Sequence, residues 1–147
     1  MFETVVIATD GSKSAERSVT MAVDLAAKFR GDVHALYVVD TDEIEESPEE
    51  IRDDLERAIH EAGNEALSFA QSEVNDLDRT EISTAIRQGD PASEIMTYAD
   101  EVDADAIALG TRGRHGDHAF LLGSVAEAVV RQAPQPVLTV RQLEAGT

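Results

Sequence analysis

The sequence predicts an α/β fold, a three-layer sandwich in which helices cover both faces of a five-stranded parallel sheet. Five short apolar or β-branched segments alternate with four segments of helical periodicity along the 147 residues. The connection between the first two strands is long enough for the crossover that parallel pairing requires. We expect residues 1–147 to form a single domain, because this length buries a core without disulfides or metals.

The first strand is predicted over residues 3–9 (ETVVIAT), a nearly continuous β-branched run typical of a strand covered on both faces. The turn Asp10-Gly11-Ser12 follows it. Apolar residues at helical spacing then predict a helix up to residue 30, with Gly31 as its stop. The second strand is predicted over residues 32–39 (DVHALYVV).

Residues 40–50 (DTDEIEESPEE) read as an acidic connection, with a helix beginning at Ser47-Pro48 because proline suits the first helical turn. An apolar stripe from Ile51 to Val74 predicts one long helix. The third strand is expected over residues 80–87 (TEISTAIR) and is followed by a turn at Gln88-Gly89.

The last part of the chain repeats the same alternation. Asp90 and Pro91 predict the N-cap and first position of a helix. Residues 104–109 (ADAIAL) predict the fourth strand, residues 124–132 the last helix, and residues 136–141 (PVLTVR) the fifth strand. Residues 142–147 are expected to form a loose tail.

The charge balance is strongly acidic. Thirty Asp and Glu residues against twelve Lys and Arg give a net charge of −18. Nucleic acid is therefore an unfavourable partner, since binding to a phosphate backbone requires a basic footprint. We hypothesise that the protein is halophilic, because molar salt screens the repulsion among its charges; a melting temperature unchanged between about 0.1 M and 3 M KCl would contradict this.

Thiol chemistry and membrane insertion are not expected. The chain contains no cysteine, which excludes disulfides and cysteine-ligated metals. Its N-terminal apolar run is too short for a signal peptide or a membrane span. These features indicate a soluble, cytoplasmic protein without a membrane partner.

A glycine-rich loop lies between the fourth strand and the last helix. Gly110, Gly113, Gly123 and Ser124 have the spacing G-x2-G-x9-G-S. Glycines let the backbone approach an anion, and the first amides of a helix are unpaired and carry the positive end of its dipole. The loop is therefore a candidate phosphate site.

A purely structural role for the same loop is also possible. Ser124 and Glu127 have the spacing of a capping box, and glycines between a strand and a helix are common for geometric reasons alone. The two interpretations are compatible, because a capped helix still offers its remaining amides to a ligand.

Asp10 is the second candidate ligand residue. Ligands of parallel α/β sheets bind beyond the carboxyl ends of the strands, where the strand order reverses. Asp10 and Gly110 both lie at such ends, and they converge if the first and fourth strands are neighbours. Asp40 also follows a strand, but it begins an acidic run and is interpreted as solvated surface.

The basic residues of the loop have no assigned role. Arg112 and Arg114 could neutralise phosphate charge or could be ordinary loop residues. His115 and His118 suggest a metal pair, but only Asp117 is nearby to complete a site, so a solvated loop is favoured and no metal site is predicted.

Taken together, these segments resemble the universal stress protein (UspA-like) family over almost the whole chain. The resemblance is carried by VVIATDGSKSAERSV, YVVD, GDPASEIMTYADEVDADAIALGTRG and LLGSVAEAVVRQAPQPVLTVR. The spacing G-x2-G-x9-G-S resembles that of the ATP-binding members of the family. The family fold is Rossmann-like with strand order 3-2-1-4-5, and its members usually form homodimers, here implying pairing of the Val137–Val140 edge strand.

The resemblance also implies site residues. The adenosine end of an adenine nucleotide would lie near Asp10 and the backbone of Val38, and the ribose and first phosphates against Gly110 and Gly113.

The outer phosphates would be held by the backbone of Gly123, Ser124, Val125 and Ala126, with the Ser124 hydroxyl. Ala126 departs from members that have threonine there, so one phosphate contact is missing.

The expected function is that of a cytoplasmic, ATP-binding stress-response regulatory module, with Mg²⁺ or Mn²⁺ accompanying the nucleotide. No catalytic residue is assigned, because the sequence has no G-x4-G-K-[ST] motif and no placed general base. Slow ATP hydrolysis and a nucleotide-independent dimeric scaffold stay open as alternatives.

Overall fold

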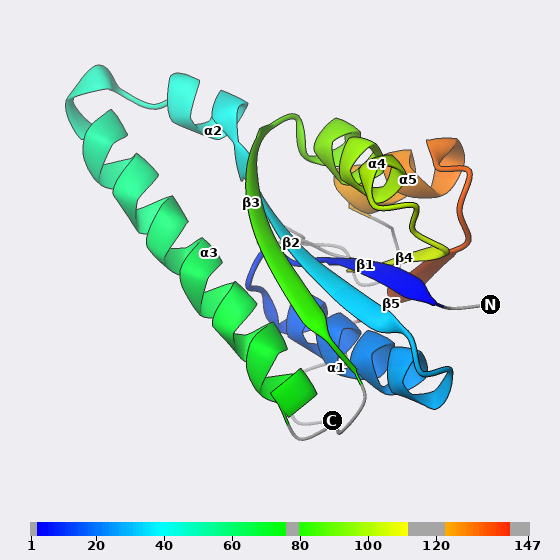
Figure 1. Cartoon of the computed structure of the whole chain (residues 1–147). Helices are drawn as coiled ribbons and strands as arrows, with labels where there is room; N and C mark the ends of the chain where they lie inside the picture. The colour runs from blue at the N-terminus through cyan, green and yellow to red at the C-terminus, as the bar shows by residue number, and fades with distance from the viewer. Residues whose placement is uncertain (1–2, 76–79, 112–122, 142–147) are drawn as a thin grey trace.

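The computed structural model describes residues 3–75, 80–111 and 123–141. Its five-stranded parallel sheet has the order β3-β2-β1-β4-β5 (Figure 1). The strands are β1 (Thr4–Ala8), β2 (Asp32–Asp40), β3 (Ile82–Gly89), β4 (Ala106–Gly110) and β5 (Val137–Val140). The helices are α1 (Lys13–Lys28), α2 (Thr41–Glu45), the 3-10 turn η1 (Glu49–Ile51), α3 (Arg52–Asn75), α4 (Pro91–Glu101) and α5 (Ser124–Gln132). The predicted fold class and strand order are confirmed.

Helices cover both faces of this sheet. α1 and α3 lie on one face, and α4 and α5 lie on the other (Figure 1). Val5 and Ile7 of β1 belong to the core beneath α1 and α3, whereas Val6 and Ala8 belong to the core beneath α4 and α5. Because alternate residues of a strand point to opposite faces, a central strand buried on both sides has to be apolar throughout.

The core beneath α3 contains an unusually close helix-to-strand contact. The Tyr37 ring of β2 is 1% exposed, and it packs directly on Gly63 in the middle of α3. A Cβ atom on Gly63 would lie 2.7 Å from Cδ1 and 2.9 Å from Cε1 of this ring. The absence of a side chain at residue 63 is therefore what lets α3 approach the sheet.

β3 lies further along the chain than predicted. β3 runs from Ile82 to Gly89, so Gln88 and Gly89 are strand residues and not a turn. The cause is tertiary: β2 continues to Asp40, which pairs with Gly89, and this neighbour extends the end of β3 to Gly89.

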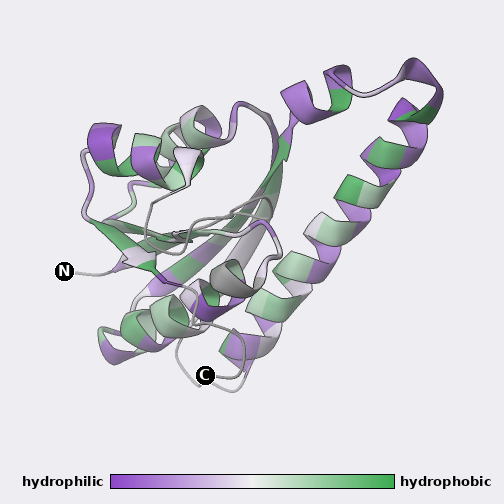
Figure 2. Cartoon of the chain, turned by 180° about the vertical axis from the view of Figure 1, so that it is seen from behind, coloured by the Kyte–Doolittle hydropathy of each residue, from purple (hydrophilic) through white to green (hydrophobic). Residues whose placement is uncertain are grey.

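The acidic connection after β2 is also more regular than expected. Asp40 caps the short helix α2, and its Oδ1 accepts a hydrogen bond from the Asp42 amide at 3.0 Å. α2 and the start of α3 are mainly hydrophilic and extend away from the sheet (Figure 2). Among the described residues, no helix combines the length and apolar character needed to cross a bilayer.

Candidate functional site

A cavity of about 320 Å³ opens at the carboxyl ends of the strands. β1 pairs with both β2 and β4, so the direction of strand addition reverses between β1 and β4. Ligands of open α/β sheets bind in the crevice at this point. The described lining residues are Ala8, Thr9, Asp10, Ala15, Leu36, Val38, Asp40, Glu43, Pro91, Ile95, Leu109, Gly110, Thr111, Gly123, Ser124, Val125 and Ala126.

The turn between β1 and α1 holds Asp10 at this cavity. The Gly11 amide donates to Thr9 Oγ1 at 3.2 Å, and the Ser12 amide donates to Asp10 Oδ1 at 2.9 Å. Gly11 has φ +81°, a conformation that glycine adopts without steric cost. Ser12 then caps α1, since its Oγ accepts from the Ala15 amide at 3.2 Å. Local hydrogen bonds therefore fix the position of the carboxylate.

The N-terminus of α5 forms the opposite wall. Gly123 is its N-cap, and the Glu127 amide makes the first intrahelical hydrogen bond to the Gly123 carbonyl at 2.9 Å. The amides of Ser124, Val125 and Ala126 precede this bond and line the cavity end of the helix. Such amides bind anions, assisted by the helix dipole.

The capping-box interpretation of Ser124 and Glu127 is wrong. A capping box needs a serine or threonine side chain at the N-cap, and that position belongs to Gly123. Glu127 instead pairs with Arg131 at 2.8 Å, one turn further along α5. The Ser124 hydroxyl therefore has no capping role.

Hydrogen bonds close the two ends of the glycine loop. The Gly123 amide donates to the Thr111 carbonyl at 2.6 Å, and the Thr111 amide donates to the Val140 carbonyl at 3.0 Å. These bonds anchor the start of α5 beside the end of β4, so Gly110 and Gly123 reach the same cavity.

The remaining walls are mostly apolar. Leu36 and Val38 come from β2, Leu109 comes from β4, and Pro91 and Ile95 come from the first turns of α4. Sequence reasoning assigned a ligand role only to Val38. Pro91 could have been predicted to line the cavity. It begins a helix that follows a strand, and the N-termini of such helices border this edge of the sheet.

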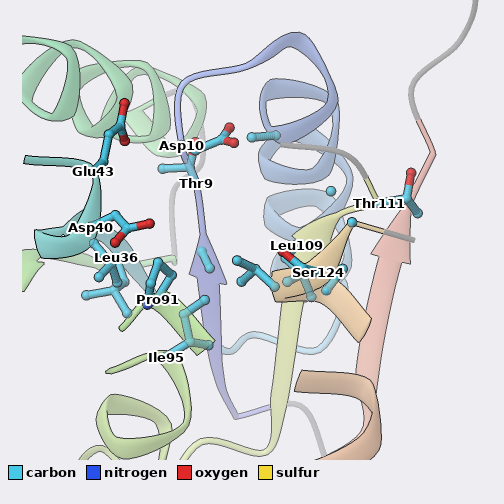
Figure 3. Close-up of a pocket in the computed structure, with 17 residues that line it drawn as sticks. Thr9, Asp10, Leu36, Asp40, Glu43, Pro91, Ile95, Leu109, Thr111 and Ser124 are labelled. Carbon is cyan, nitrogen blue, oxygen red and sulfur yellow. The ribbon is translucent and has the colours of Figure 1, made fainter. Parts of the chain in front are cut away.

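Asp40 and Glu43 add two carboxylates to the cavity; the sequence placed Asp40 beside this edge of the sheet but gave it no ligand role, and it did not single out Glu43. Both line the cavity, together with Asp10 (Figure 3). The interpretation of Asp40 as solvated surface is therefore incomplete: it is half-buried, caps α2 and faces the cavity. Glu43 reaches the same cavity from the first turn of α2, the helix that Asp40 caps.

The cavity brings the predicted ligand residues together wherever the structure describes them. Seven of the eight line it: Asp10, Val38, Gly110, Gly123, Ser124, Val125 and Ala126. The eighth, Gly113, lies outside the described residues, as do the basic loop residues Arg112, Arg114, His115 and His118 and the tail 142–147.

Comparison with known proteins identifies the family. The model of the "Universal stress protein family" matches residues 1–141. A universal stress protein of Methanocaldococcus jannaschii is 36% identical over 143 residues, which cover 97% of this chain and 84% of that protein. The chain belongs to the universal stress protein family.

Solved structures share the fold, and some hold nucleotides. The structure of hypothetical protein MJ0577 has a TM-score of 0.87 at 27% identity and covers 99% of both chains. A universal stress protein in complex with cAMP has a TM-score of 0.69 at 28% identity, covering 95% of this chain and 97% of its own. The Archaeoglobus fulgidus universal stress protein in complex with dAMP has a TM-score of 0.65 at 26% identity, covering 96% and 98%.

Proposed function

We propose that this universal stress protein binds an adenine nucleotide, ATP, in the cavity at the β1–β4 switch point. It acts as a cytoplasmic regulatory module with little or no turnover. The observation that carries the proposal is the convergence of the α5 N-terminus with an apolar cavity at this switch point. The nucleotide complexes of two structural neighbours support a ligand of this class.

The chemistry of the walls matches the parts of a nucleotide. Leu36, Val38 and Ile95 offer an apolar surface to a base, and Asp10 offers hydrogen-bond acceptors to a ribose or an amino group. The amides of Ser124 and Val125 offer donors to phosphate oxygens. Mg²⁺ or Mn²⁺ would neutralise part of the triphosphate charge while held mainly by phosphates and water.

Nucleotide extraction tests the proposal. The protein is purified in high salt and denatured, and released small molecules are identified by chromatography and mass spectrometry. We expect stoichiometric ATP or ADP; where the purified protein is empty, we expect millimolar ATP with Mg²⁺ to raise its melting temperature, because a ligand that binds only the folded state stabilises it. An empty protein without such a shift would favour the dimeric scaffold. Steady-state turnover would favour the slow hydrolase.

We further propose that the chain forms a homodimer through β5 and has no nucleic-acid or membrane partner. β5 is an edge strand, and the carbonyls of Pro136 and Val140 already accept hydrogen bonds from the amides of Ile107 in β4 and of Thr111, which follows β4. The amide and carbonyl groups of successive residues point to opposite sides of a strand. The backbone groups of Val137 and Thr139 therefore point to the open edge.

Thr139→Pro is expected to convert the dimer to a monomer. Proline removes an outward-facing amide and is tolerated on edge strands, so the fold is retained. Light scattering at micromolar concentration should give twice the 15.9 kDa of one chain for the native protein and for Thr139→Val, which keeps the amide, and a single-chain mass for Thr139→Pro. A native monomer, or a dimer that survives Thr139→Pro, contradicts pairing at this edge.

A further inference from the structure

The cavity is electrostatically divided. The carboxylates of Asp10, Asp40 and Glu43 lie on the β1 and β2 side, whereas Ser124 and Thr111 lie on the β4 and α5 side (Figure 3). No lysine, arginine or histidine is among the described residues that line it. One half of the cavity therefore carries negative charge, and the other ends at the positive pole of a helix.

Secondary structure holds the acidic half in place. Asp40 is the N-cap of α2, with its Oδ1 3.0 Å from the Asp42 amide, and Glu43 lies in the first turn of the same helix. The Ser47 hydroxyl donates to the Glu43 carbonyl at 2.8 Å. At α2's far end, the Arg52 guanidinium donates to the Glu45 carbonyl at 2.8 Å. The Asp40 carboxylate and the backbone of Glu43 thus belong to one hydrogen-bonded turn.

This division constrains a bound nucleotide. If the 5′-phosphates lie at α5, then the ribose and base extend toward Asp10, Asp40 and Glu43. Hydroxyl and amino groups donate hydrogen bonds to carboxylates, so an uncharged ribose and base suit this half. A second phosphate there would meet like charge in a partly desolvated cavity, where repulsion is stronger than in water.

We propose that Asp40 and Glu43 determine ligand specificity: they make the cavity accept adenine nucleotides phosphorylated only at the 5′ position and reject those with a further phosphate on the ribose. The inference rests on the proposed function, since it concerns the same cavity. The two carboxylates discriminate between nucleotides by the charge on the ribose, which neither the apolar walls nor the α5 amides can do.

Titration calorimetry with AMP and with adenosine 3′,5′-bisphosphate tests this specificity. We expect the native protein to bind AMP about tenfold or more tightly than the bisphosphate, a difference of about 1.4 kcal/mol. The preference should shrink between about 0.2 M and 1 M KCl, because the Debye length falls to about 3 Å.

The decisive variant is Asp40→Asn/Glu43→Gln, in which asparagine preserves the helix cap. It should lose most of the native preference, because Asp10 is then the only one of the three carboxylates in this half that keeps its charge. The matched control is Asp53→Asn/Asp54→Asn, which removes two charges from exposed positions of α3 that do not line the cavity. It should keep the native preference.

Three outcomes overturn the inference. Equal binding of the two nucleotides by the native protein excludes charge selection. An unchanged preference in Asp40→Asn/Glu43→Gln assigns the selection to other residues. A preference lost equally in the control assigns it to the net charge of the whole chain. Failure of the proposed function gives a different result, since then neither AMP nor ATP binds.

Discussion

Replacing Ser124 with proline is expected to weaken ATP binding about 10- to 100-fold without unfolding the protein, because hydrogen bonds to charged groups contribute about 1.5–3 kcal/mol. Proline removes both the amide and the hydroxyl of the first residue of α5. It suits this position: the preceding Gly123 has φ −66° and ψ 162°, an extended conformation that is compatible with a following proline. The Ser124 amide also precedes the first intrahelical bond, so no helix hydrogen bond is lost.

Ser124→Ala separates the two groups. It removes only the hydroxyl, so its loss of affinity should be clearly smaller than that of Ser124→Pro. Affinities are measured by titration calorimetry with ATP and Mg²⁺, and melting temperatures without ligand check that both variants are folded. Equal affinities of a folded Ser124→Pro and Ser124→Ala would show that this amide does not hold phosphate.

Gly63→Ala is expected to lower the free energy of unfolding by about 1–3 kcal/mol, as overpacking does in a filled core. At an exposed helix position the same change would stabilise by about 1 kcal/mol. Here the new methyl group would lie 2.7 Å from Cδ1 and 3.1 Å from Cγ of the buried Tyr37 ring. The Tyr37 ring, α3 or β2 has to shift, and the ring is buried while β2 is held between β1 and β3.

Urea unfolding at constant high salt measures this effect. Asn64→Ala is the control, because Asn64 is the exposed neighbour on α3 and the change should be neutral or stabilising. In a Tyr37→Leu background the cost of Gly63→Ala should fall, since the smaller side chain leaves room for the methyl group. A stabilising Gly63→Ala, or a cost unchanged by Tyr37→Leu, would contradict this account.

The sequence predicted most of the secondary structure, because each signal is local. The buried strand β1 follows from residues 3–9, and the start of α4 follows from Asp90 and Pro91, where the Asp90 side chain caps the helix as expected. The glycine spacing predicted that Gly110 and Gly123 lie at one candidate site, and both line the cavity, because glycines between a strand and a helix N-terminus are local features too.

Boundaries that depend on partners were predicted less well. β3 extends to Gly89 because β2 continues beside it, and residues 41–45 form a helix because Asp40 caps them at the end of that strand. The capping box at Ser124 failed because the loop closes through the bond between Gly123 and Thr111, which leaves Gly123 as the N-cap.

By itself the sequence determined the fold class, the family and the two ends of the candidate cavity, because these depend on periodicity and on spacing within single segments. Only the tertiary structure decided what closes that cavity. It placed Asp40 and Glu43 opposite the α5 N-terminus and packed Gly63 against Tyr37. Such contacts join residues far apart in the chain, and their geometry is set by how the sheet and helices pack together.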